Sequence, residues 1–93
     1  MKRNEKLIPI EGIFSPDEAK EILMNMIKSK INFHNIKNWS SNERFGKDDE
    51  TAKRRIPELK KDLEKLETIL AEAKTLNKKL IVDSEINIIL SGE

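Results

Sequence analysis

Few side chains in this sequence have the types and spacing that catalysis requires, and the single histidine, His34, is the first to consider. A catalytic histidine needs an orienting carboxylate or a nucleophile within hydrogen-bond reach. Its neighbours Phe33 and Asn35 supply neither. A metal site would need carboxylates from distant segments, and no spacing in the chain indicates such a site. We therefore expect His34 to be a capping or surface residue.

The acidic run 48–50 is the next candidate, because carboxylates are ligands for hard cations. It lacks the alternating spacing of a calcium-binding loop. We interpret it as the start of a helix, because negative charge is favourable in the first helical turn. Ser40 and Ser41 lack the glycines that frame a nucleophilic serine. The chain contains no cysteine, which excludes thiolate metal sites and disulfides. We predict no enzymatic activity, no cofactor and no metal.

The densest group of basic residues could bind phosphate, and it consists of Lys53, Arg54, Arg55, Lys60 and Lys61. The formal net charge is only +1, whereas nucleic-acid-binding domains usually carry a clear basic excess. A solvated helix start, balanced by nearby acids, is our first interpretation. Nucleic-acid contact through these residues is the alternative.

Two large aromatic residues, Trp39 and Phe45, lie in polar surroundings. They belong to a predicted loop over residues 38–49. Our first interpretation is that they pin this loop to the ends of the flanking helices, because aromatic burial dominates small cores. The alternative is an exposed aromatic pair that binds a protein partner.

The most regular pattern in the chain lies between residues 56 and 76. Apolar residues recur there at alternating steps of three and four, which places them on one side of a helix. We predict a helix over residues 50–77, with a bend near Pro57 because proline removes a backbone hydrogen bond. Asn77 is suited to a left-handed cap. The apolar residues are Ile56, Leu59, Leu63, Leu66, Leu70 and Ala73.

A second helix is predicted over residues 16–33. Ser15 and Glu18 have the spacing of a capping box, and Pro16 suits the first helical position. We place the end of the helix between residues 30 and 35, because the following run is β-branched and rich in asparagine. Within the loop, Ser40 and Glu43 could form another capping box, with Gly46 as a left-handed stop. The inner face is expected to carry Ala19, Ile22, Leu23, Met26 and Ile27.

Two segments alternate between apolar and polar residues, as half-buried strands do. They are residues 7–14 and 80–90, and residues 1–6 before them form a flexible basic segment. Pro9 confines the first strand to an edge. We expect Ile8 and Ile10 to share a buried face with Val82, Ile86 and Ile88.

These elements predict one α+β domain of order β-α-α-β over residues 1–93. A long antiparallel helix hairpin packs on a small antiparallel two-stranded sheet, and the strands pair within one chain or between two copies. The apolar surface of the helices exceeds what one ribbon can cover, which favours a homodimer. No stretch is long enough to span a bilayer, so we expect a cytoplasmic protein without membrane contact.

The order of a strand followed by two helices over residues 5–77 resembles ribbon-helix-helix repressors. That resemblance implies paired N-terminal strands that enter the major groove of DNA. The chain departs from the pattern because Pro9 and Glu11 stand where such a strand carries basic or amide side chains. The C-terminal strand also has no place in that fold. Our leading prediction is therefore a small non-enzymatic interaction or scaffold protein that self-associates or binds another protein, and nucleic-acid regulation is the alternative.

Overall fold

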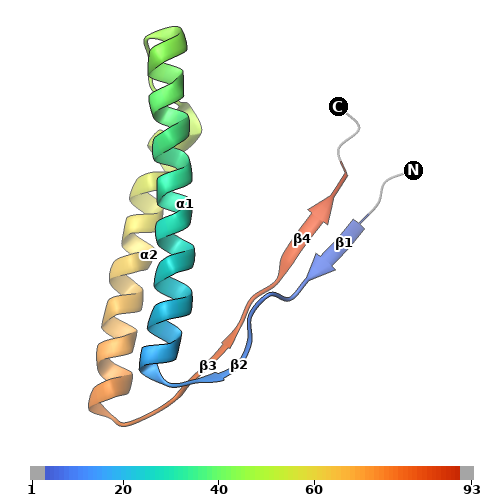
Figure 1. Ribbon diagram of the computed structural model, residues 1–93. Coiled ribbons are helices and arrows are strands. Elements are labelled where there is room, and N and C mark those ends of the chain that lie inside the picture. Colours follow the sequence, from blue (N-terminus) through green and yellow to red (C-terminus); the bar gives the residue numbers. More distant parts are fainter. Residues whose placement is uncertain (1–3, 91–93) are drawn as a thin grey trace.

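The computed structural model describes residues 4–90, and this part of the chain contains two helices and four strands. The helices form an antiparallel pair, and a narrow β-ribbon leaves one end of the pair at an angle, so that the molecule is V-shaped (Figure 1). The predicted α+β fold with a helix hairpin and antiparallel strands is confirmed. Each of the two predicted strands is divided in two, so that the order is β-β-α-α-β-β with two two-stranded sheets. The elements are β1 Asn4–Leu7, β2 Glu11–Phe14, α1 Pro16–Phe45, α2 Glu50–Thr75, β3 Leu80–Asp83 and β4 Ile86–Ile89.

Helix α1 begins as predicted, with Ser15 as its N-cap. The backbone N–H of Glu18 donates to the Ser15 hydroxyl at 3.2 Å, and the backbone N–H of Ser15 donates to the Glu18 carboxylate at 2.9 Å. These reciprocal bonds satisfy two donors that a helix start otherwise leaves open. Because only Ser15 separates β2 from α1, the cap also fixes the direction in which the ribbon leaves the helix.

The end of α1 differs from the prediction, because the helix continues to Phe45 instead of ending near residue 33. Residues 38–45 of the predicted loop are therefore helical, and the second capping box at Ser40 and Glu43 is wrong. Polar side chains extend the helix here by binding the connection to α2. Asn38 accepts from the backbone N–H of Asp49 at 2.8 Å, and Ser41 donates to the carbonyl of Lys47 at 2.8 Å. Gly46 is the predicted left-handed stop, with φ of 67°.

Helix α2 begins at Glu50 as predicted, and the carboxylate of Asp49 caps it by accepting from the backbone N–H of Ala52 at 2.8 Å. Pro57 lies inside one continuous helix. The predicted bend at this proline stays a prediction. The helix ends at Thr75, two residues earlier than predicted, and Asn77 adopts the expected left-handed conformation with φ of 52°.

The main buried cluster lies at the end of the helix pair that carries the ribbon, and Ala52 and Leu59 are buried farther along α2. Ala19, Leu66 and Leu70 form its buried centre. Met24 packs against this cluster, whereas Met26, which we expected inside, is exposed. The apolar residues of α1 are thus divided between two sides of the helix. The partly buried residues around the centre are Phe14, Leu23, Met24, Ile27 and Leu80.

The N- and C-terminal segments pair antiparallel within one chain, which confirms the predicted partners. β1 pairs with β4, and β2 pairs with β3. Residues 8–10 separate β1 from β2, whereas residues 84–85 separate β3 from β4, and this extra residue forms a bulge. The backbone N–H of Ser84 donates to the carbonyl of Ile10 at 2.9 Å across it. Because the N-terminal strands pair with the C-terminal ones, they do not form the ribbon of a ribbon-helix-helix repressor.

The helices cover only the base of this ribbon. α1 contacts β2 and β3, and the β1–β4 half extends away from the helix pair (Figure 1). Ile8, Ile86 and Ile88 are therefore exposed, and the predicted common buried face is wrong for them. Residues 4–6 of the predicted flexible segment belong to β1, and residues 1–3 lie outside the described residues.

The buried position of Leu66 generates a prediction. Leu66→Ala is expected to lower the free energy of unfolding by roughly 2–5 kcal/mol, because it removes buried methyl groups and leaves a cavity. Ile69→Ala is the matched control on the exposed side of α2 and should change stability by less than about 0.5 kcal/mol. Urea unfolding measures both values. Equal losses would contradict the assignment of Leu66 to the core.

The capping box predicts a pH dependence. The backbone and side-chain hydrogen bonds with Ser15 lower the pKa of Glu18 below its ordinary value of 4.5. A lowered pKa in the folded state stabilises the fold above the unfolded pKa, and this stabilisation is lost as the pH falls through the folded pKa. The stability difference between the native chain and Glu18→Gln should therefore shrink below about pH 4.5. Thermal unfolding across this range measures it, with Glu21→Gln as control, and a constant difference would contradict the prediction.

Candidate functional site

A row of exposed apolar side chains runs along α1 on a side that does not pack against α2. We call Ile22, Met26, Phe33 and Ile36 the outer stripe. Their spacing, with Ser29 in the gap, follows steps of four and three, which keeps them on one side of the helix. Phe33 and Ile36 are each 57% exposed. The outer stripe is therefore an apolar surface with no cover in the described chain.

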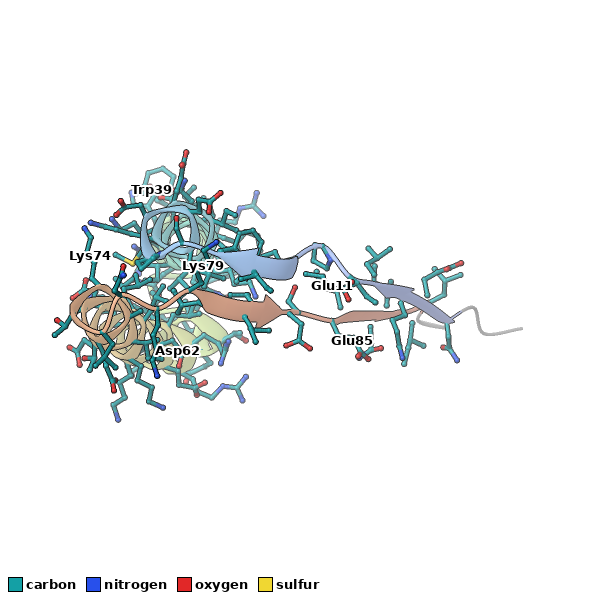
Figure 2. All side chains as sticks on the ribbon, turned by 90° about the horizontal axis from the view of Figure 1, so that it is seen from below. Glu11, Trp39, Asp62, Lys74, Lys79 and Glu85 are labelled. Carbon is teal, nitrogen blue, oxygen red and sulfur yellow. The ribbon has the colours of Figure 1, made fainter. Side chains whose placement is uncertain are left out.

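The outer stripe lies on the side of α1 from which the ribbon projects. Figure 2 looks along the helices from below, so α1 runs away from the viewer. Because the helix is right-handed, successive residues are then rotated clockwise around its axis. Trp39 projects upward in this view. Each residue is rotated by about 100° from the one before it, and this rotation places the centre of the outer stripe about 100° clockwise from Trp39. The outer stripe therefore faces the ribbon. The ribbon and the helix pair enclose the open angle of the V on this side of the molecule (Figure 1).

The β2–β3 part of the ribbon is apolar on both faces. One face carries Phe14 and Leu80, which pack on the core. On the other face, Ile13 lies opposite Ile81 in the register, and these side chains are 67% and 85% exposed. This second face therefore offers a small apolar surface to solvent.

Two acidic residues share this outward face of the ribbon. Glu11 lies directly opposite Asp83 in the antiparallel register. Like charges at directly opposite positions destabilise a strand pair. Neither side chain forms an ion pair or hydrogen bond with the described residues. A cation placed over this pair would relieve the repulsion.

The two aromatic residues predicted to bind a partner are both on α1. Trp39 is 65% exposed and Phe45 is 70% exposed, so the interpretation that they pin a loop is wrong. They are six positions apart on the helix, which is about 9 Å along the axis and about 120° around it. The structure does not bring them together as a pair. Their role in partner binding stays a prediction.

The predicted basic residues lie along the first half of α2. Arg55 forms an ion pair with Glu58, and the other four are exposed. Lys53 and Lys60 share one side of the helix, and Arg54 and Lys61 share the next, because each pair is separated by two turns. Acidic residues lie in the same turns and divide the positive charge. They are Glu50, Glu58, Asp62 and Glu64.

His34 lies half-buried on the inner side of α1, so its predicted place as a capping or surface residue is wrong. Its ring meets the Phe33 ring edge-on, with 5.3 Å between the two ring centroids. Its buried Nδ1 has no hydrogen-bond partner among the described residues. Asp48 and Asp49 serve the helix connection, since Asp48 accepts from Asn42 at 3.0 Å and Asp49 caps α2. Within residues 4–90, no three histidine or carboxylate side chains converge to hold a metal ion.

A shallow groove of about 250 Å³ lies between the start of α1 and the end of α2. An ion pair between Lys74 and Asp17, at 3.2 Å, joins two of its lining residues. Both side chains are largely exposed, so they form a solvent-exposed ion pair of small stabilising effect. The groove is therefore a surface depression between the ends of the two helices.

The outer stripe is the surface that sequence reasoning missed. The sequence pattern predicts Ile22 and Met26 on the inner face together with their neighbours, and it predicts an end of α1 before Ile36. The signal was present in the regular spacing from residue 22 to residue 36. It defines a second apolar row about 100° or more away from the inner row of Leu23, Ile27 and Ile31.

Trp39 is the only tryptophan and therefore reports on its own surroundings. We expect the emission of a solvated indole and strong quenching by acrylamide, because the side chain is exposed. The emission should not change on dilution, since Trp39 lies outside the outer stripe. Protein unfolded in urea is the reference for full exposure. A blue shift that grows with protein concentration would contradict this expectation and place Trp39 in an interface.

No helix in residues 4–90 combines the length and apolar character needed to cross a membrane. Comparisons of the chain with protein-family models, with curated proteins and with solved structures find no match.

Proposed function

We propose that this chain is a small non-enzymatic interaction protein that acts as a homodimeric scaffold. The observation that carries the proposal is the outer stripe, a regular apolar row on a helix whose opposite side already packs on α2. Contiguous exposed apolar surfaces of this kind mark interaction sites. Amphipathic helical surfaces are commonly covered by a partner through residues at such spacing.

The extended shape of the chain supports self-association. Its radius of gyration is 16.8 Å, whereas a compact domain of this length has about 12 Å. Its accessible surface is 7759 Å², compared with about 5,500 Å² expected for a compact monomer of 10.8 kDa. A chain with this much exposed surface and a core of small extent gains stability by covering part of it.

Other functions have less support from the described residues. An adaptor for a different protein would use the same outer stripe, and the composition of a complex distinguishes it from a homodimer. Nucleic-acid binding through the basic residues of α2 is disfavoured because acidic side chains divide them. The absence of cysteine suits a reducing compartment, and we place the protein in the cytoplasm on that ground.

Analytical ultracentrifugation tests the proposal. The native chain is expected to form dimers at micromolar concentration, and Phe33→Asp with Ile36→Asp should shift it to monomers by placing charge in an apolar contact. Trp39→Asp is the control, since it places one aspartate at an exposed aromatic position outside the outer stripe. Circular dichroism verifies that the helices persist. A native chain that remains monomeric up to about 100 µM, where weak dimers would form, contradicts the proposal.

A further inference from the structure

We infer that the outward face of the β2–β3 ribbon docks on the outer stripe of a second copy, and that the second copy returns the same contact. This inference rests on the proposed self-association and names the two surfaces that meet. The ribbon contributes Ile13 and Ile81 with the acidic pair Glu11 and Asp83. The helix contributes the outer stripe with Lys30 and Lys37.

The charges on the two surfaces are complementary. Lys30 and Lys37, separated by two turns, lie on the flank of the outer stripe next to the inner face. Both are exposed, and the Nζ atom of Lys37 lies over the Phe33 ring, 5.7 Å from its centroid. Glu11 and Asp83 repel each other and lack a cation among the described residues. A lysine from another copy would supply the opposite charge to this pair.

The spacing of apolar and charged groups also matches. On the ribbon, Glu11 lies two residues from Ile13, which is about 7 Å along the strand. On α1, Lys37 lies four residues from Phe33, which is about 6 Å along the helix. An isoleucine pair seated on Phe33 would therefore place its acidic neighbours within reach of a lysine. Two copies of the outer stripe facing each other would bring lysines together, which disfavours a helix-on-helix dimer.

The V shape permits a reciprocal contact. The ribbon projects from the same side of the molecule that the outer stripe faces (Figures 1 and 2). Two copies related by a two-fold axis can each place the ribbon in the open angle of the other, as an isologous interface requires. The surface in excess of a compact monomer, about 2,000 Å² per chain, is enough for a homodimer, which buries on the order of 1,000 Å² or more from each partner.

Charge exchange tests this arrangement. The helix variant carries Lys30→Glu and Lys37→Glu, and the ribbon variant carries Glu11→Lys and Asp83→Lys. Each variant alone places like charges in both contacts, so its dimer dissociation constant should rise by at least about tenfold. Mixing the two variants, or combining all four changes in one chain, restores opposite charges and should bring the constant back to within about threefold of the native value.

The controls separate charge from folding. The ribbon variant keeps a like-charged pair across β2 and β3, so the ribbon itself should be no less stable than in the native chain. Lys60→Glu with Lys61→Glu makes the same change of charge on α2 as the helix variant makes on α1, and it should leave association unaltered. Circular dichroism measures whether each variant retains its helices.

The outcomes distinguish this inference from the proposed function. Restoration by the mixed variants supports the reciprocal contact. A native dimer that neither charge variant weakens, or one that the exchange does not restore, overturns the contact and leaves self-association standing. A native chain that stays monomeric overturns both. A complex with a different protein in place of a dimer overturns the choice of a second copy.

Discussion

The packing of Ala19 against Leu66 and Leu70 is the contact on which the rest of the structure depends. It joins the start of α1 to the end of α2, and Phe14 and Leu80 of the ribbon close over the same cluster. The small side chain of Ala19 allows the helices to approach closely at this point. Loss of this contact would release the ribbon and loosen this end of the helix pair, whereas Ala52 and Leu59 are buried farther along α2.

One consequence is that the ribbon is held at a single end. The capping box fixes Ser15 in an extended conformation, with φ of −67° and ψ of 160°, and so fixes the angle at which β2 leaves α1. Phe14 must point into the core while Ile13 points away from it, because neighbouring residues of a strand face opposite sides. The ribbon therefore cannot fold back onto the outer stripe of its own α1 without breaking the capping box and withdrawing Phe14.

The sequence predicted those features that local chemistry determines. The capping box, the apolar row of α2 and the left-handed caps at Gly46 and Asn77 follow from nearby residues. The antiparallel strand partners follow from the helix hairpin, which brings the two ends of the chain together. The length of α1 did not, because Asn38 and Ser41 stabilise the helix end through bonds to the connection, and propensity alone disfavours that segment. The bulge opposite residues 84–85 was hidden because alternation does not reveal an extra residue in one strand.

The outer stripe escaped prediction for a different reason. The apolar residues between positions 19 and 27 form one broad face of the helix in the sequence pattern. Only the position of α2 divides them into an inner face and an outer stripe. Tertiary packing determines which row contacts α2. The small side chain of Ala19 permits a closer approach of α2 than the larger side chain of Ile22 would. Once that choice is made, the remaining row is exposed, and the chain's own ribbon is directed away from it. The packing of α2 on the inner face of α1 therefore both forms the core and leaves the outer stripe exposed.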